Sequence, residues 1–266
     1  MIRLPISVYI IGYNEEKKIK DCLESVSDIV DEIVFVDSHS TDSTVSIVRE
    51  YTTKIYTRDF NSYTDQKNYA QSLCKNEWVL NLDCDERLSP EAREELLNKF
   101  PSIQENPEIV GISFPRLTFY LYKFLRHGGW YPDRKIRLVR KCCCAWEGKR
   151  LHEEMKCKGN IVPFQGDILH YSFDSVDDHL KTIMKFSEMG AQDLWDKGRR
   201  SSLCTMVART FWTGFRKIFL EFAFLDGVAG IIMTGFSMAA TWSKYSKLYL
   251  LQKKQILNQK GNSAVQ

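Results

Sequence analysis

Short apolar runs alternate with amphipathic stretches over the first hundred residues. The apolar runs predict strands at residues 7–11, 33–36, 54–56 and 78–82. Apolar residues at helical spacing predict helices at 17–26 and 65–73, and a third from an N-cap at Ser40 or Thr41 to about Tyr51. Strands that are apolar throughout and alternate with helices are typical of a parallel sheet covered on both faces. The pattern therefore predicts an α/β domain.

Carboxylates follow two of these strands directly. Asp37 ends the second strand, and Asp83 and Asp85 come after the fourth. In open parallel sheets, ligands bind beyond the carboxyl ends of the strands. Because a strand alternates its side chains with a period of two, Asp83 and Asp85 are expected on one side, and such a pair needs a cation such as Mg²⁺ or Mn²⁺, shared with substrate phosphates. The alternative is a polar turn after a core strand.

Three segments, residues 7–16, 33–44 and 81–86, resemble the inverting nucleotide-sugar glycosyltransferases of family 2. The closer resemblance is to the β-1,4-glucosyltransferase-like enzymes of bacterial lipopolysaccharide or lipooligosaccharide core synthesis, and it extends over residues 130–138, 151–153, 169–171 and 214–250. It implies a GT-A-like nucleotide-binding domain, with a mostly parallel central sheet flanked by helices, plus a C-terminal helical appendage.

The expected division of the chain follows from this resemblance. Residues 1–175 form the glycosyltransferase domain, with the nucleotide-sugar part in 1–100 and the acceptor part in 101–175. Residues 176–266 form a basic, amphipathic helical region.

The resemblance also implies a donor site. The base and ribose are expected at three residues after the first strand: Tyr13, Asn14 and Glu15. Asp37 is expected to accept hydrogen bonds from uracil or ribose, Lys67 to contact the diphosphate, and Asp83 to reach ribose or sugar hydroxyls. Structural alternatives remain open: a core aromatic for Tyr13, a turn-stabilising Asp37 and an exposed helical Lys67.

The metal ligands and the sugar pocket are expected further along the chain. Asp85 is the stronger metal-ligand candidate of the pair with Asp83, and His170 is a candidate third ligand or phosphate contact, although a lone histidine is more often structural. Trp130 and Asp133 are expected to border the sugar pocket, since an aromatic face and a carboxylate suit a pyranose.

Inversion needs a base that deprotonates the acceptor hydroxyl. The family position for this carboxylate corresponds to Glu153 in Leu-His-Glu-Glu, which we take as the catalytic base. Glu154 and His152 remain alternatives, and without the resemblance Glu153 would read as a surface carboxylate.

Charge is distributed unevenly along the chain. Residues 197–266 carry 11 Lys or Arg and two Asp or Glu, a net charge of +9, whereas residues 1–196 carry −6. The basic region includes an uncharged stretch, Gly227–Ser243, at the lower edge of the length needed to span a bilayer. Five basic residues, Arg209, Arg216, Lys217, Lys244 and Lys247, bracket it and predict docking on an anionic membrane surface. A pair of core helices and a true span are the alternatives.

The remaining composition indicates a cytoplasmic setting. The eight cysteines show no metal-binding spacing and suit a reducing compartment. The N-terminus lacks the pattern of a signal peptide. The expected location is therefore cytoplasmic, peripheral to the inner face of the membrane. A nucleic-acid partner is not expected, because the basic region carries no recognised motif and the front domain is acidic.

The expected function is transfer of a hexose, glucose first, from a UDP-sugar to a lipid-linked saccharide with Mg²⁺ or Mn²⁺. A metal-dependent nucleotidyltransferase would have a Gly-rich basic loop after the first strand, where this chain has Gly-Tyr-Asn-Glu-Glu. A dehalogenase-type phosphatase would have its Asp-x-Asp motif after the first strand. A non-catalytic scaffold that retains nucleotide binding is distinguished only by assay.

Overall fold

The computed structural model describes residues 3–148, 153–173 and 175–263, which form two compact units. The first unit contains the chain up to Thr118 together with Pro132–Ser172. The second contains Phe119–Tyr131 and the chain from Phe173 onward. The second unit therefore begins close to the expected boundary at residue 175, but it also takes in residues 119–131, which the sequence assigns to the first domain.

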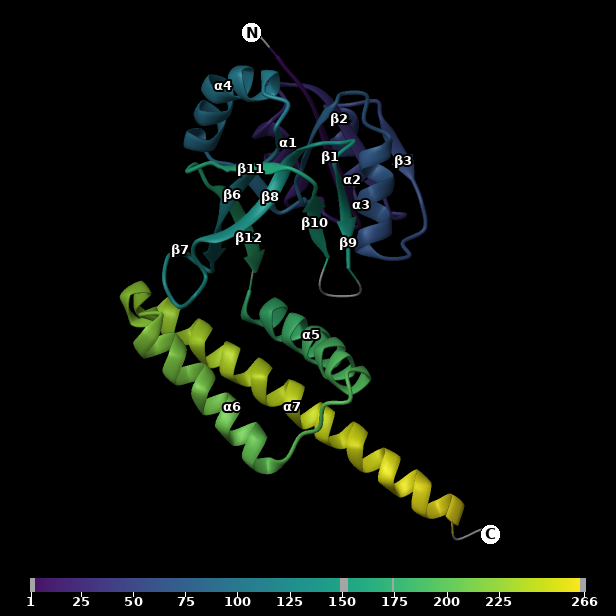
Figure 1. Ribbon diagram of the computed structural model, residues 1–266, viewed down its shortest axis with the longest axis vertical. Coiled ribbons are helices and arrows are strands. Elements are labelled where there is room, and N and C mark those ends of the chain that lie inside the picture. The colour runs from purple at the N-terminus through teal and green to yellow at the C-terminus, as the bar shows by residue number, and fades with distance from the viewer. Residues whose placement is uncertain (1–2, 149–152, 174, 264–266) are drawn as a thin grey trace. The chain divides into compact units, whose positions relative to one another are not determined.

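The first unit is built on a mixed sheet (Figure 1). Its four parallel strands lie in the order β3 (Ile55–Thr57), β2 (Val30–Asp37), β1 (Leu4–Gly12) and β4 (Trp78–Asn81). The sheet continues through β8 (Asp133–Arg140), antiparallel to β4, then β6 (Ile109–Tyr120), β12 (Ile168–Phe173) and β5 (Glu86–Leu88). Strand β11 (Asn160–Pro163) also pairs with β6, as does β7 (Lys123–Leu125), which belongs to residues 119–131 of the second unit. The predicted α/β fold and its parallel strands are confirmed.

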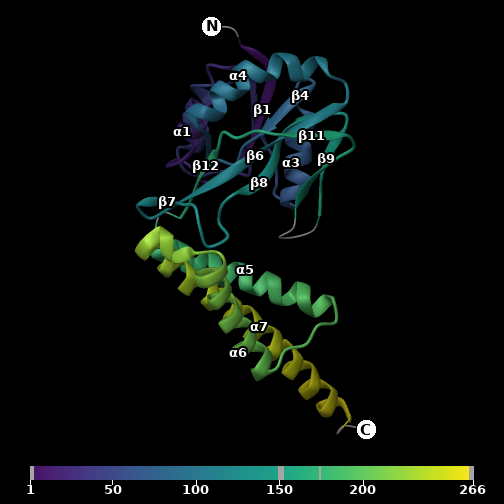
Figure 2. The ribbon, with the colours of Figure 1, turned by 60° about the vertical axis from the view of Figure 1, so that its left-hand side comes forward.

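Both faces of the sheet are covered, as the uniformly apolar strands predict. Helices α1 (Ile19–Glu24), α2 (Thr44–Arg49) and α4 (Pro90–Glu105) pack on one face. Helix α3 (Tyr63–Ser72) and the two-stranded ribbon of β9 (Cys144–Glu147) and β10 (Glu154–Cys157) pack on the other. Figure 2 shows α4 and α3 on opposite sides of the strands.

Two local expectations need correction. Helix α2 starts at Thr44 rather than after Ser40 or Thr41, because Asp42 accepts the Thr44 N–H at 3.0 Å while Ser40 and Thr41 bond to Asn14. The expectation of reduced cysteines also fails at one pair. Cys144 and Cys157 face each other across the β9–β10 ladder and form a disulfide.

The second unit consists of helices together with residues 119–131. The helices are α5 (Val176–Asp196), α6 (Leu203–Phe215), the π-helix η1 (Arg216–Leu220), the 3₁₀ helix η2 (Ala223–Asp226) and α7 (Gly227–Ser263). Helix α7 packs against both α5 and α6. Buried Asp226 joins residues 119–131 to this unit, because its carboxylate accepts the N–H groups of Arg126 and His127 at 2.8 Å.

Within the described part of the chain, one segment is long and apolar enough to cross a membrane. By length and composition alone, Ala223–Gln255 meets that criterion, and a third of its most apolar window is buried within the protein.

Candidate active site

The loops after β1 and β2 form one side of the site. The strands are in register at Gly12 and Asp37, so both chains leave the sheet at the same edge. Asn14 has a positive φ of 54°, and its side-chain oxygen accepts the Thr41 N–H at 2.8 Å, which joins the two loops. The Glu15 N–H donates to Thr44 Oγ1 at 2.7 Å. Tyr13 is 57% exposed and is therefore not a core aromatic.

Asp37 is buried at the end of β2 and only partly bonded. Its Oδ2 accepts the Ser40 N–H at 3.0 Å, whereas its Oδ1 has no hydrogen-bond partner among the described residues. Buried Gln66 lies near this loop. Its amide N–H donates to Ser38 Oγ at 3.1 Å, and its Oε1 has no partner within the same part of the chain. Buried acceptors are normally bonded, so two unbonded acceptors fit a ligand that supplies N–H or O–H donors. Gln66 carries no motif and was not predicted.

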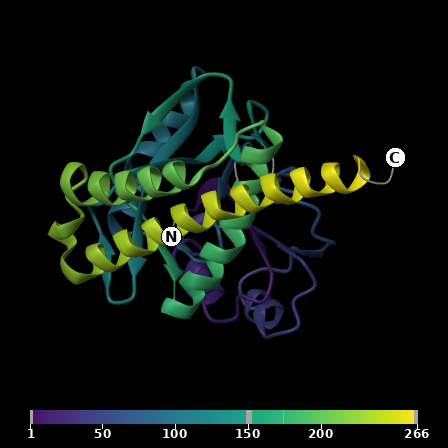
Figure 3. The same cartoon turned by 90° about the horizontal axis from the view of Figure 1, so that it is seen from below.

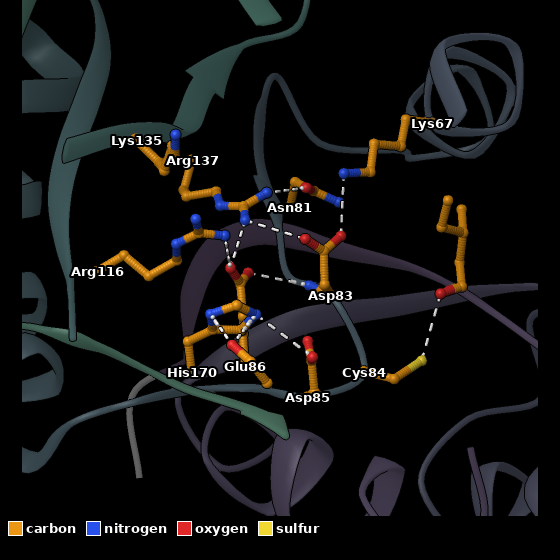
Figure 4. Close-up of polar contacts among 12 residues, drawn as sticks. Lys67, Asn81, Asp83, Cys84, Asp85, Glu86, Arg116, Lys135, Arg137 and His170 are labelled. Carbon is orange, nitrogen blue, oxygen red and sulfur yellow. Dashed lines mark hydrogen bonds and ion pairs between the residues drawn. The ribbon is translucent and has the colours of Figure 1, made fainter. Parts of the chain in front are cut away.

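The sequence-based geometry of the acidic pair is wrong. Strand β4 ends at Asn81, so the alternation of a strand does not apply to Asp83 and Asp85. Residues 83–86 form a turn that is closed by the Glu86 N–H donating to the Asp83 carbonyl at 2.9 Å. As Figure 4 shows, the Asp83 side chain points toward Lys67 and Arg137, and Asp85 points toward His170.

Asp83 is held between two buried cations. Lys67 Nζ lies 3.0 Å from its Oδ1, and an Arg137 guanidinium nitrogen lies 3.0 Å from its Oδ2. Although burial opposes ionisation, Lys67 and Arg137 hold the pKa of Asp83 well below its ordinary value. Asp83 is therefore charged and neutralised by protein groups. Lys67 is buried rather than exposed, with its Nζ 4.4 Å from the centroid of the Trp146 ring.

Glu86, Arg116 and Asn81 complete this cluster, and the sequence analysis gave none of them a role, although Asn81 and Glu86 lie in the segment 81–86 that carries the resemblance. Fully buried Glu86 is paired with Arg137, and Arg116 lies 3.7 Å from the same carboxylate. Arg137 also donates to Asn81 Oδ1 at 2.6 Å. Arg137 falls within the segment 130–138 that carried the resemblance, but nothing in its local pattern indicated that it is buried.

Asp85 and His170 form the more open part of the site. His170 Nε2 is 3.4 Å from Asp85 Oδ2, and both side chains are partly exposed. Strands β5 and β12 bring them together, since His170 pairs with Glu86 and the Tyr171 N–H donates to the Asp85 carbonyl at 2.9 Å.

Among the described residues, no group of three His, Cys, Asp or Glu side chains is placed to hold a metal ion. One carboxylate and one imidazole nevertheless suit an ion whose other ligands are phosphate oxygens and water, as is usual for Mg²⁺ and Mn²⁺. The fit therefore depends on Asp85 and His170, since Asp83 is engaged by cations.

The expected base lies at the start of the β9–β10 ribbon. Glu153 is half-buried just before β10, whereas Glu154 is exposed in the strand and bonds to Lys156 at 2.5 Å. His152 lies outside the described residues. Burial, followed by the charges of Glu153 and Asp83, raises the pKa of Tyr63 on α3.

Asp133 and Trp130 have different surroundings. Asp133 belongs to the first unit, where Arg116 contacts it at 2.5 Å and Lys135 at 3.0 Å. Against the effect of burial, these two cations lower its pKa. Trp130 belongs to the second unit, where Lys217 Nζ lies 5.3 Å from its ring centroid. Its expected role at the sugar stays a prediction.

Comparison with known proteins identifies the family. The model for "Glycosyl transferase family 2" matches residues 7–146, which include the loops after β1 and β2 and the acidic turn after β4. The chain belongs to glycosyltransferase family 2. Lys67, Asp83 and Arg137 thus lie within the part of this family 2 glycosyltransferase that the family shares.

Similar proteins extend the match over nearly the whole chain. An "Uncharacterized glycosyltransferase" of Rickettsia felis is 27% identical over 95% of this chain and 93% of that protein. The "Lipopolysaccharide core biosynthesis glycosyltransferase LpsC" of Rhizobium meliloti is 29% identical over 92% of this chain and 90% of its own. Among solved structures, S. aureus TarS residues 1–349 match 69% of this chain and 64% of that chain, with 18% identity and a TM-score of 0.44.

Proposed function

We propose that this family 2 glycosyltransferase moves a hexose, with glucose as the first candidate, from a UDP-sugar to a lipid-linked saccharide during synthesis of lipopolysaccharide core or a related envelope glycan. The observation that carries this proposal is that the two carboxylates of the acidic turn have different partners. Asp83 is neutralised by Lys67 and Arg137, whereas Asp85 lies beside His170 and faces no basic Lys or Arg partner among the described contacts. The similarity to LpsC supports the choice of acceptor class.

The donor nucleotide would occupy the edge where β1 and β2 end. The unbonded Oδ1 of Asp37 would accept a hydrogen bond from uracil N3–H or from a ribose hydroxyl. Exposed Tyr13 would stack on the base. Because Lys67 is bound to Asp83, it would hold that carboxylate toward ribose or sugar hydroxyls and add positive charge near the diphosphate.

Asp85 and His170 would hold Mg²⁺ or Mn²⁺ with the diphosphate. When bound, such an ion neutralises the charge that develops on the leaving UDP. Lys67 and Arg137 lie on the other side of the turn and offset the charges of Asp83 and Glu86. The turn can therefore approach an anionic diphosphate without a large net repulsion.

Glu153 would act as the base. It would take the proton of the attacking acceptor hydroxyl on the face of the sugar opposite UDP, so that the anomeric configuration inverts. Glu154 is less suited, because its carboxylate is exposed and bonded to Lys156. The acceptor would be presented at the inner face of the cytoplasmic membrane, and the protein would associate with that surface peripherally.

A donor screen tests the proposal. UDP release should be measured for a panel of UDP-hexoses and for GDP- and ADP-glucose, with Mn²⁺, Mg²⁺ or chelator, and with a lipid-linked core saccharide as acceptor. We expect one UDP-hexose to support acceptor- and metal-dependent release of UDP. Nucleotide binding without turnover for every donor would favour a non-catalytic scaffold, and release of diphosphate in place of UDP would favour a nucleotidyltransferase.

A further inference from the structure

The second unit presents apolar side chains that the proposed chemistry does not use. On α6, Leu203, Val207, Phe211 and Phe215 recur every four residues, and all four are exposed, Phe211 to 70%. Four residues are slightly more than one helical turn, so these side chains lie along one side of α6. Exposed apolar areas of this extent mark interaction surfaces.

Helix α7 carries a matching stripe. Val228, Ile231 and Trp242 are exposed at helical spacing. The neighbouring sides of α7 are occupied: Thr241 contacts Thr213 of α6 at 3.3 Å, and Ser243 contacts Ser187 of α5 at 3.0 Å.

The two stripes lie on the same side of the α6–α7 pair. At about 100° per residue, the α7 stripe borders the side of α7 that contacts α6 through Met238, Thr241 and Ser246, and it lies on the side away from α5. The same count on α6, measured from Met206 and Thr213, places its stripe on that side too. Figure 3 shows α6 and α7 side by side, with α5 behind them. We call this surface the apolar face.

The turn between α6 and α7 extends the apolar face with aromatic side chains. Phe219, Phe222 and Phe224 are each about half exposed, and the rings of Phe215 and Phe219 are 5.1 Å apart. Phe222 has a φ of 54°, a conformation that phenylalanine rarely adopts. The strained backbone and exposed rings show that the turn holds its aromatic residues outward instead of burying them.

The charge of the second unit favours an anionic lipid surface over a second copy of the chain as the partner of the apolar face. The chain from residue 197 carries +9, so a second copy would meet a surface of the same sign, whereas an anionic lipid surface is complementary. Phenylalanine and tryptophan beside basic residues are also typical of helices that lie in the membrane interface.

Charge alone is not enough to describe the contact. Lys217 Nζ donates to the Gly128 carbonyl at 2.6 Å, Lys247 Nζ donates to the Met184 carbonyl at 2.8 Å, and Lys244 is partly buried next to Gly190. Arg216 is paired with Glu221 at 3.1 Å, so four of the five basic residues that predicted electrostatic docking make contacts within the unit.

We infer that the apolar face inserts in-plane into the interfacial layer of an anionic bilayer, so that apolar burial, rather than the five basic residues, supplies most of the salt-resistant binding. This deepens the proposed function by naming the surface that meets the membrane. Polar contacts at Thr241, Ser243 and Lys247 hold the middle of α7 to α5 and α6, which favours a helix that stays among its neighbours over one that crosses the bilayer.

Vesicle co-sedimentation tests the inference without donor or acceptor. Full-length protein should be mixed with phosphatidylglycerol–phosphatidylcholine vesicles or with phosphatidylcholine alone, at about 0.1 M and 1 M salt, which shortens the Debye length from about 10 Å to 3 Å. We expect binding to anionic vesicles that largely survives 1 M salt, and weaker but measurable binding to neutral vesicles. The triple variant Phe211→Ser, Phe215→Ser, Phe219→Ser should bind at least tenfold more weakly to both.

Matched controls distinguish insertion by the apolar face from a general effect of removing exposed apolar side chains. Met184→Ser and Phe186→Ser remove exposed apolar side chains of α5 and should leave vesicle binding unchanged. Replacing Arg209 with Gln should weaken only the binding to anionic vesicles at low salt. Circular dichroism should confirm that every variant is folded, and UDP release with a detergent-solubilised acceptor should be the same for the triple variant and the wild type.

The outcomes are distinct. Wild-type binding that 1 M salt abolishes, or a triple variant that binds normally, would overturn insertion by the apolar face. Resistance to alkaline extraction together with protease protection of α7 would indicate a true span instead. A concentration-dependent dimer that the triple variant lacks, without vesicle binding, would show that a second copy covers the face. A failed donor screen would leave the vesicle result standing, because the two assays share no ligand.

Discussion

Asp83 and Asp85 are separated by one residue, yet their side chains have opposite partners. Lys67 and Arg137 compensate the charge of Asp83, so that carboxylate can stay ionised although it is partly buried. Asp85 contacts an imidazole and is open to solvent on one side. The roles of Asp83 and Asp85 therefore follow from the groups that each carboxylate contacts, and not from their spacing in the sequence.

We predict that Asp85→Ala abolishes metal-dependent turnover of the UDP-sugar while the fold is retained. Removing a ligand of a Lewis-acid metal should cost several kcal/mol in the transition state, or a rate loss of at least about 10²-fold. Initial rates across a Mn²⁺ titration would measure the loss, with circular dichroism as the check on folding. Wild-type rates for Asp85→Ala in the presence of chelator would contradict the assignment of Asp85 and His170.

Glu153→Gln removes the base with little change in shape. Transfer should fall by roughly 10²–10⁴-fold, the usual contribution of a general base, while the donor still binds. Product formation and UDP affinity should be measured on the same preparation. Glu154→Gln is the matched control, and we expect nearly wild-type transfer. The reverse result would move the base to Glu154, and normal transfer by both variants would leave His152 to be tested.

At the scale of elements, the buried cluster joins four parts of the first unit. Lys67 comes from α3, Asp83 from the turn after β4, Glu86 from β5 and Arg137 from β8. Its position fixes the direction of the turn that carries Asp85. A charge that loses its partner while buried is strongly destabilising, so this cluster should couple stability to the geometry of the site.

Arg137→Met tests that coupling. The substitution leaves Asp83 and Glu86 with fewer cationic partners, and we expect the free energy of unfolding to fall by roughly 3–5 kcal/mol, as measured in urea. Adding Glu86→Gln should recover part of the loss. A loss under 1 kcal/mol in Arg137→Met would contradict the coupling.

The same cluster should make stability depend on pH. Because the pKa of Asp83 is lowered in the folded state, the contribution of Asp83 to the free energy of unfolding is present above about pH 4 and is lost as the pH falls below that value.

Within the second unit, buried His179 should make helix packing sensitive to acid. Its ring stacks on Phe173 at 4.2 Å and its Nδ1 is 3.1 Å from the Tyr120 hydroxyl, and burial lowers its pKa to about 4. Since the unfolded pKa is about 6.5, stability is complete above pH 6.5 and falls progressively toward pH 4, by roughly 2–3 kcal/mol.

The measurement is hydrogen exchange of α5 as a function of pH. His179→Phe should remove the pH dependence between pH 6.5 and 4, although the Tyr120 hydroxyl loses its partner. An unchanged pH profile in that variant would assign the effect to another group.

At the scale of the whole molecule, donor binding should protect one unit selectively. Asp37, Asp83 and Asp85 all belong to the first unit, so UDP with Mn²⁺ should slow amide exchange there and leave α6 unchanged. Exchange mass spectrometry with and without UDP measures this. Protection of residues 119–131 would support the predicted role of Trp130 at the sugar, and equal protection of both units would contradict a donor site confined to the first.

The strands and their ends could be predicted because the residues that determine them are neighbours in the sequence. Apolar runs located β1, β2, β3 and β4, and the polar residues that follow them located the site edge. The turn at 83–86 could not be predicted, because its direction depends on Arg137, 54 residues further along the chain. The same holds for Gln66, whose burial depends on how α3 packs, and for the Cys144–Cys157 pair, which depends on the register of the β9–β10 ribbon.

The discontinuity of the second unit has a consequence for how such proteins can be recombined. Residues 119–131 are separated in sequence from the rest of the second unit, yet they contact it directly. Tyr120 packs on His179, and Asp226 bonds to the backbone of Arg126 and His127. A crossover that exchanged only the region from residue 173 onward with a relative would separate these partners. Functional chimaeras would need two inserted segments from the same parent, and natural exchange of the helical unit between lineages should be correspondingly rare.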